Sequence, residues 1–181
     1  MNIEIEKQIQ ELQKKVGNLE KGTKDQMSIV VFSGELDKLL AAMIIATGAT
    51  AMDTKVKLFF TFWGTSALRD IKKKAKGKDF MSKMFGIMLP KGSKKVKLSK
   101  MNMGGAGTAM MKTLMKKKNV SSLEEMFKIA GELGVEINVC EMTMNLMGFT
   151  KDELIDYPHM EICGVGTFLA DADESKVQLF I

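Results

Sequence analysis

The stretch SIVVFSGELDKLLAAMIIATGATAM, residues 28–52, decides the fold class of this chain. Residues 28–33 form a short, mostly apolar run, which is typical of a strand buried on both faces of a parallel sheet. Gly34 interrupts the run, and residues 35–52 then carry apolar side chains at helical spacing. A buried strand followed by a loop and a helix predicts one unit of an α/β fold with parallel strands.

The same alternation continues to the end of the chain. Further strands are expected at residues 56–63, 98–103, 135–139 and 177–181. Further helices are expected behind an N-cap at Thr65, at residues 104–118, behind a capping box at Ser122, and at residues 151–155. Together these elements predict a three-layer α/β/α sandwich with a mostly parallel sheet of about five strands, preceded by an N-terminal helix.

Residues 1–21 are expected to form that helix, in front of an α/β domain at residues 27–181. Its apolar residues are spaced alternately by four and three positions, as in a coiled coil: Ile5, Ile9, Leu12, Val16 and Leu19. This stripe predicts either that the helix packs against its own domain or that subunits associate through it. The sequence leaves both open.

Charge is distributed unevenly along the chain. The 181 residues carry a net charge of +5, but residues 55–118 hold 18 basic and 2 acidic side chains, and residues 119–181 hold 3 and 12. The basic segment is either a solvated surface or attracts a protein or a small anion. Nucleic acid is not expected, because Arg69 is the only arginine. Within the segment, a Met-rich insert at residues 72–97 predicts an amphipathic helix over a site or part of a subunit contact.

Two cysteines, Cys140 and Cys163, are too few for a disulfide scaffold, and no secretion signal is recognisable. The longest apolar stretch, residues 39–51, is shorter than the roughly 20 residues that span a bilayer. We therefore expect a cytoplasmic protein without a membrane span. His159 is the only histidine and has no partner at metal-ligand spacing, so a metal site is not expected.

Cys140 is the strongest candidate for a chemical role. It follows the strand expected at 135–139, and ligands of parallel sheets bind at the carboxyl ends of strands. A helix is expected from Met142, so its free N–H groups would lower the pKa of the thiol, with support from Thr143. Glu141 opposes this effect because a neighbouring carboxylate raises a thiol pKa. A small buried cysteine without a chemical role remains the alternative.

Two other features are weaker candidates. Cys163 either resolves an oxidised Cys140 or is a packed residue beside glycines, since 22 intervening residues say nothing about distance. The turn Gly104-Gly105-Ala106-Gly107 follows an expected strand and opens a helix, so we expect it to bind an anion together with Asn102. It matches neither a P-loop nor a dinucleotide fingerprint, no cofactor is expected, and a simple tight turn is the alternative.

Several of these stretches together resemble the DsrE/DsrF-like proteins, specifically the DsrE/DsrF/DrsH-like family. The stretches are residues 28–35, 59–64, 100–111, 122–123 and 140–152. The most specific among them is the block Cys-Glu-Met-Thr-Met at residues 140–144 with Met-Gly at 147–148. An N-terminal coil-like helix is also usual in this branch.

The resemblance implies a parallel α/β/α fold and a homo-oligomer. It also implies that a cysteine carries sulfane sulfur as a persulfide and exchanges it with rhodanese-like or TusA-like proteins. Cys140 occupies the position of that cysteine, whereas Cys163 stands where relatives commonly have glycine. We therefore expect a sulfur carrier, acting as a sulfurtransferase or stoichiometrically. A non-catalytic binding module for a nucleotide or small anion and a peroxiredoxin-like thiol redox protein are the alternatives.

Overall fold

The computed structural model describes residues 2–22, 24–73 and 80–181, and its centre is a five-stranded parallel sheet. The strands are β1 (Lys24–Val31), β2 (Lys55–Phe60), β3 (Glu136–Cys140), β4 (Met160–Cys163) and β5 (Ser175–Phe180). They lie in the order β4-β3-β2-β1-β5, and every pairing is parallel. All five carboxyl ends therefore meet at one edge of the sheet.

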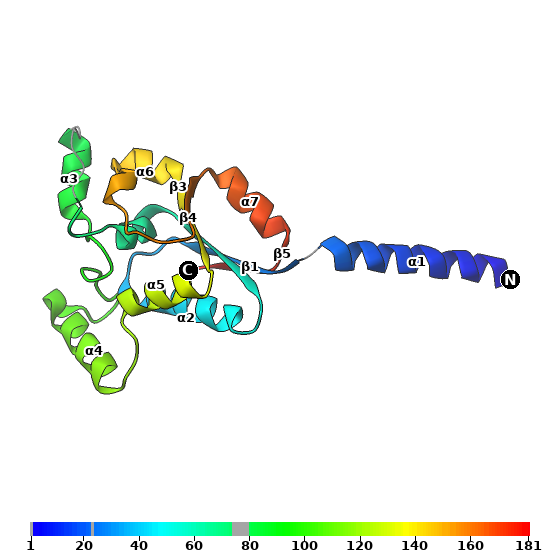
Figure 1. Ribbon diagram of the computed structural model, residues 1–181, viewed down its shortest axis with the longest axis horizontal. Coiled ribbons are helices and arrows are strands. Elements are labelled where there is room, and N and C mark those ends of the chain that lie inside the picture. Colours follow the sequence, from blue (N-terminus) through cyan, green and yellow to red (C-terminus); the bar gives the residue numbers. More distant parts are fainter. Residues whose placement is uncertain (1, 23, 74–79) are drawn as a thin grey trace.

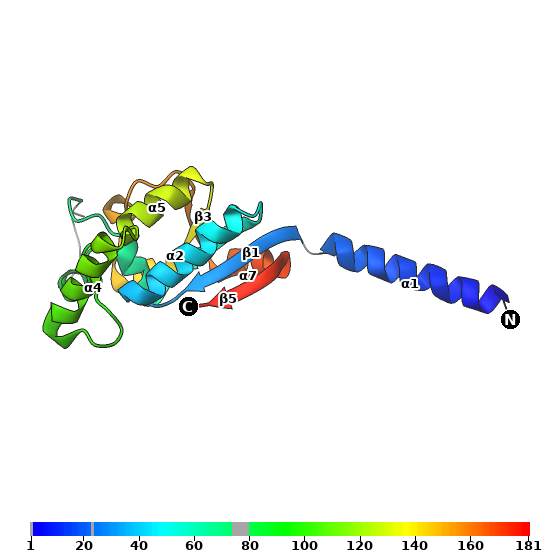
Figure 2. The ribbon, with the colours of Figure 1, turned by 90° about the horizontal axis from the view of Figure 1, so that it is seen from below.

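Helices cover both faces of this sheet (Figures 1 and 2). Helices α2 (Leu36–Thr50) and α5 (Leu123–Glu132) lie on one face, where the Phe60 ring of β2 packs against Phe127 of α5. Helices α6 (Glu141–Met147) and α7 (Val165–Asp173) lie on the other face, where the Phe59 ring stacks on Phe168 of α7. Consecutive strand residues thus serve opposite layers, which confirms the predicted α/β/α sandwich.

The main core lies between the sheet and the layer of α2 and α5. Strand residues such as Ile29, Leu58 and Ile137 are fully buried there, together with Leu39 and Met43 of α2. The capping box predicted at Ser122 is confirmed, because Ser122 N–H donates to the Glu125 carboxylate at 2.7 Å and Glu125 N–H donates to Ser122 Oγ at 3.3 Å. These contacts place α5 against the sheet in the predicted position.

Two of the sequence expectations are wrong, and one strand was not expected. Residues 98–103 form a loop, where Met101 and Met103 are exposed with positive φ, and Leu98 N–H donates to Thr108 Oγ1 rather than to a strand. The sheet reaches five strands through β4, where the sequence analysis expected no strand. Thr65 is not an N-cap, since it lies inside the 3-10 helix Phe62–Leu68, and that helix begins after Thr61.

The long connection from β2 to β3 contains that 3-10 helix, α3 (Phe80–Met88) and α4 (Ala106–Lys117), with the 3-10 turn Met103–Gly105 before α4. Part of the predicted Met-rich insert, residues 74–79, lies outside the described residues. Helix α3 lies beside α6 (Figure 1), and a Cβ at Gly148 would meet Ser82 Cβ at 2.1 Å. Helix α3 of the insert therefore lies next to α6, the helix that follows Cys140.

Arg69, the single arginine, is buried and holds the connection between β2 and β3 in place. Its guanidinium is 3% exposed, pairs with the Glu153 carboxylate at 3.4 Å and lies 4.6 Å from the centre of the Phe149 ring. It also donates to the carbonyl oxygen of Gly86 in α3, at 3.3 and 3.2 Å. One buried cation thus joins α3 to the chain segment that follows α6.

Helix α1 (Asn2–Gly22) extends away from the sheet (Figures 1 and 2). Four residues of its predicted apolar stripe are exposed by 49 to 59%: Ile5, Ile9, Leu12 and Val16. Packing of this stripe against its own domain is therefore not seen in the structure.

Candidate functional site

Cys140 is the last residue of β3, and its backbone is the N-cap of α6. The apolar run before it makes β3 a central strand between β2 and β4, and the cysteine residue is only 3% exposed. Its side chain lies on the α7 face, because Asn138, two positions earlier on the strand, bonds to Asp171 of α7. The thiol is therefore held at the carboxyl edge of the sheet, under the start of α6.

Polar groups of Thr61, Met142 and Thr143 lie near this sulfur. Burial raises the pKa of the Cys140 thiol, but hydrogen bonds from the hydroxyl and N–H of Thr143, the hydroxyl of Thr61 and the N–H of Met142 outweigh burial and lower it. The Glu141 side chain is exposed, and its proximity does not reverse this direction. The arrangement favours a thiolate at a position where burial alone would favour the neutral thiol.

The two threonines are themselves held in place. Thr143 Oγ1 accepts a hydrogen bond from Phe62 N–H at 3.0 Å and lies 3.0 Å from Thr61 Oγ1. Because Phe62 N–H occupies one acceptor position of Thr143, the hydroxyl protons of the two threonines remain to be shared between each other and the sulfur. Phe62 has φ of 43°, a conformation that costs a bulky residue energy. We refer to Cys140, Thr61, Phe62, Met142 and Thr143 as the thiol site.

The structure brings together only part of what the sequence suggested. Thr143 was predicted to support the thiol, and the structure places its side chain and N–H beside Cys140. Thr61 and Phe62 were missed, because their role depends on β2 lying next to β3, and the sequence does not reveal strand order. The signal available was a threonine inside an otherwise apolar run, Phe59 to Trp63, at the carboxyl end of a strand.

Cys163 lies directly beside Cys140. The two residues are register partners on the adjacent strands β3 and β4, although 22 residues separate them in the sequence. Cys163 is only partly buried. Burial raises the pKa of its thiol, the charges of Asp171 and Glu161 raise it further, and a hydrogen bond with Thr167 opposes them. Neighbouring cysteines thus have thiol pKa values displaced in opposite directions.

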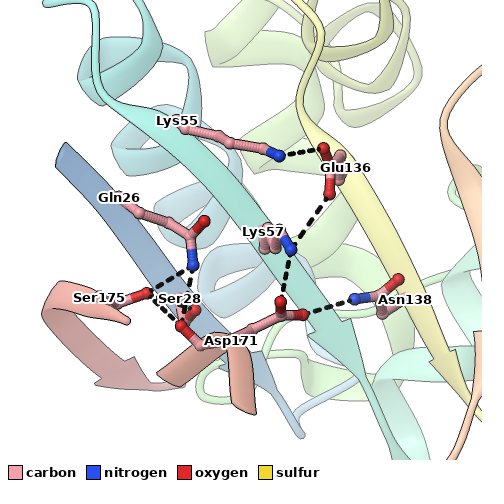
Figure 3. A network of polar contacts seen from close by, with 8 residues as sticks. All are labelled: Gln26, Ser28, Lys55, Lys57, Glu136, Asn138, Asp171 and Ser175. Atoms are coloured by element: carbon pink, nitrogen blue, oxygen red, sulfur yellow. Dashed lines mark hydrogen bonds and ion pairs between the residues drawn. The ribbon is translucent and has the colours of Figure 1, made fainter. Parts of the chain in front are cut away.

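A second polar cluster occupies the same face of the sheet (Figure 3). We call it the Lys57 network, and its members are Gln26, Ser28, Lys55, Lys57, Glu136, Asn138, Asp171 and Ser175. Asp171 pairs with Lys57 and accepts from the Asn138 amide at 3.2 Å. Glu136 lies 2.8 Å from Lys55 Nζ and 3.6 Å from Lys57 Nζ. These contacts fix α7 on the sheet, toward the amino end of β3.

The glycine turn lies apart from the thiol site. Gly104, Gly105 and Gly107 precede or begin α4, which Figure 1 shows on the α2–α5 side of the molecule, away from α6. Asn102 Oδ1 accepts a hydrogen bond from Thr108 Oγ1 at 2.7 Å, so this side chain holds the turn together. The position gives no support to the expectation that the turn contributes N–H groups to the pocket of Cys140.

A surface cavity lies between α4 and α5. It has a volume of about 740 Å³, and Lys94, Lys112 and Lys116 are among its lining residues. None of the residues predicted to form a site lines it. Within residues 2–22, 24–73 and 80–181, no group of three His, Cys, Asp or Glu side chains is placed to hold a metal ion. Of the helices in this same part of the chain, none has the length and apolar character needed to cross a membrane.

Comparison with known proteins gives matches along most of the chain. The model of the DsrE/DsrF/DrsH-like family matches residues 23–180. Uncharacterized protein YrkE of Bacillus subtilis (strain 168) is 48% identical over 154 residues, which cover 85% of this chain and 95% of that protein. Sulfur carrier protein DsrE2 of Allochromatium vinosum is 34% identical over 160 residues, covering 86% and 98%. The crystal structure of the ychN protein from E. coli is 13% identical with a TM-score of 0.49, covering 86% and 99%.

Proposed function

The chain belongs to the DsrE/DsrF/DrsH-like family, and we propose on that basis that it carries sulfane sulfur as a persulfide on Cys140. One relative, 34% identical over nearly its whole length, is named a sulfur carrier. The observation that carries the proposal is the position of Cys140 at the carboxyl end of β3 and at the N-cap of α6, where neighbouring polar groups lower the pKa of the thiol in spite of burial. Sulfur exchange requires such a thiolate, both to attack and to leave.

Loading begins with the Cys140 thiolate. Its Sγ attacks the sulfane sulfur of a donor such as a thiosulfonate, a new S–S bond forms, and the donor leaves as a sulfinate. No net oxidation is needed, because the sulfane sulfur arrives already at the required oxidation level. The Thr143 and Met142 N–H groups and the two threonine hydroxyls stabilise the attacking thiolate in a site that is largely closed to water.

Unloading reverses the roles. An acceptor thiolate attacks the outer sulfur, the S–S bond to Cys140 breaks, and Cys140 leaves as a thiolate. The same neighbouring polar groups stabilise this leaving group, and a thiol of lower pKa leaves faster. The surface of α6 next to the site exposes Met142 and Leu146, by 54% and 59%. Apolar contacts of this kind suit a docked protein, and we expect rhodanese-like or TusA-like carriers in the reducing cytoplasm.

We also propose a homo-oligomer that assembles through α1, because the apolar stripe of this helix has no cover in the single chain. Sedimentation of the full chain would show a species larger than a monomer. Substitution of two stripe residues, Ile9→Asp and Leu12→Asp, would then shift the protein to smaller species without changing the chemistry at Cys140.

The direct test uses the full chain and benzenethiosulfonate as donor. After loading and alkylation, we expect the peptide containing Cys140 to gain about 32 Da, the mass of one sulfur atom. The gain should be absent in Cys140→Ser and present in Cys163→Ser, the matched control. A Cys140 that never gains this mass, in a protein with a normal melting transition, contradicts the proposal.

A thiol redox function is the second candidate, because Cys140 and Cys163 are register partners. Adjacent strands lie about 4.8 Å apart, within the range of Cα separations that disulfides bridge. This function predicts that mild oxidation by hydrogen peroxide gives a Cys140–Cys163 disulfide, and that sulfane donors leave no persulfide on Cys140. The same peptide analysis therefore distinguishes the two functions.

A further inference from the structure

The two cysteines project from the same face of the sheet at its carboxyl edge. Side chains alternate along a strand, and Asn138 reaches Asp171 on the α7 face, so Cys140 faces the same way. Cys163 is its register partner on β4, and directly paired residues of parallel strands project to one face. The thiols are therefore neighbours across about 4.8 Å of sheet.

Their positions in the sheet differ. Cys140 lies on a central strand and is 3% exposed, whereas Cys163 ends the edge strand β4 and is only partly buried. An acceptor protein can therefore approach Cys163 more easily than Cys140. We propose that Cys163 is a second sulfur-carrying residue, which takes the sulfane sulfur from Cys140 and presents it to the acceptor at the edge of the sheet. This inference rests on the proposed function of Cys140.

The transfer balances without any further reagent. Cys163 loses its proton to solvent, and its thiolate attacks the outer sulfur of the Cys140 persulfide. A bond forms between Cys163 Sγ and that sulfur, while the bond between that sulfur and Cys140 Sγ breaks. Cys140 leaves as a thiolate, the transferred sulfur keeps its proton, and nothing is oxidised or reduced overall. The outer sulfur extends about 2 Å beyond Cys140 Sγ, which shortens the gap to Cys163.

The opposite environments of the two thiols determine the direction in which sulfur moves between Cys140 and Cys163. A thiolate of higher pKa is the stronger nucleophile, and a thiol of lower pKa is the better leaving group. The thiol pKa of Cys163 is raised by burial and by nearby carboxylates, whereas that of Cys140 is lowered, because the polar groups of Thr143, Thr61 and Met142 outweigh burial. Both differences favour movement of sulfur from the inner cysteine to the outer one.

Sulfur on each cysteine can be followed separately in the full chain. Trypsin cleaves after Lys151, so Cys140 and Cys163 fall in different peptides, residues 129–151 and 152–176. The protein is loaded with benzenethiosulfonate, and samples are alkylated at intervals. We expect the added sulfur first on the Cys140 peptide and then on the Cys163 peptide, as the first signal declines. In Cys140→Ser, labelling of Cys163 should slow about tenfold or more, since the thiol with the larger thiolate fraction at neutral pH is lost. In Cys163→Ser, sulfur should stay on Cys140 and pass more slowly to a TusA-like acceptor.

Three results would overturn the relay. One is a Cys163 peptide that labels equally fast in wild type and Cys140→Ser. Another is a loaded Cys140 whose sulfur never reaches Cys163. The third is a Cys140–Cys163 disulfide with release of hydrosulfide, which means that Cys163 attacks the inner sulfur. Each of these differs from a Cys140 that never loads in any variant, which would refute the proposed function itself. Cys163→Ala serves as a second variant if the serine variant is poorly folded.

Discussion

Two polar clusters share one face of the sheet, two residues apart along β3, and they satisfy their polar groups in different ways. In the Lys57 network each buried charge meets an opposite charge or an amide, as Asp171 does with Lys57 and Asn138 (Figure 3). In the thiol site, neutral polar groups of Thr61, Met142 and Thr143 lie near one sulfur atom. The first arrangement secures a helix, whereas the second favours one protonation state of one atom. The polar residues nearer the start of β3 therefore hold α7 on the sheet, whereas those at its end act on the protonation of Cys140.

Removal of Asp171 should have the largest effect on stability. Asp171→Ala removes the amide partner of Asn138 and leaves Lys57 with only the longer contact to Glu136, and the Lys57 and Asp171 side chains are only 18% and 11% exposed. We expect the free energy of unfolding to fall by about 3 kcal/mol, the usual scale for breaking a buried ion pair. Urea denaturation at neutral pH measures this loss.

The matched control is Asp25→Ala, which breaks the exposed pair with Lys176. Exposed pairs contribute less than about 1 kcal/mol, so this variant should unfold nearly like wild type. If Asp171→Ala were no less stable than Asp25→Ala, the Lys57 network would have no structural role and the contrast with the thiol site would disappear.

Thr143→Val should change the reactivity of Cys140. It removes the hydroxyl donor at Cys140 and keeps the shape of the side chain, so the pKa of the thiol should rise. A hydrogen bond to a charged group contributes about 1.5 kcal/mol or more, which corresponds to roughly tenfold slower alkylation of Cys140 at neutral pH. Peptide mass spectrometry gives the rate. Thr113→Val, on the exposed side of α4, is the control and should leave the rate unchanged; equal rates in both variants would exclude the Thr143 hydroxyl as a donor.

A smaller effect is expected from Glu136 as the pH falls. Burial raises the pKa of this carboxyl, but hydrogen bonds and charges of Lys55 and Lys57 outweigh burial and lower it. Its folded-state pKa thus lies below the unfolded value, and the stability that it contributes is present above the unfolded pKa and lost as the pH falls through the folded one. From about pH 4.3 downward, wild type should lose stability faster than Glu136→Gln in urea titrations. Parallel losses would remove Glu136 from the network.

The fold could be predicted wherever local pattern reflects burial. The strand at β1 and the helix α2 follow from one apolar run and one helical stripe, and Ser122 with Glu125 marks the start of α5. Residues 98–103 were wrongly predicted to form a strand because their alternating methionines suggest one, yet Met101 and Met103 are solvent-exposed. Strand β4 was missed because four residues on an edge, partly exposed, carry little pattern.

The residues of the candidate site likewise fall into those that local sequence reveals and those that it does not. Cys140 and Thr143 could be found because a strand end followed by a helix start is visible in local sequence. Thr61 and Cys163 could not, because their proximity to Cys140 depends on the order β4-β3-β2 and on the exact register between β3 and β4. Strand order and register arise from packing across the whole domain, so spacing along the chain contains no record of them.

The rate of alkylation of each cysteine as a function of pH tests the central claim most directly, namely that the donors hold Cys140 as a reactive thiolate. Iodoacetamide and tryptic peptides 129–151 and 152–176 report Cys140 and Cys163 separately in one sample. The account predicts that the midpoint of the Cys140 profile lies below that of an ordinary thiol and that the Cys163 midpoint lies above it. A Cys140 midpoint at or above that of Cys163 would contradict it.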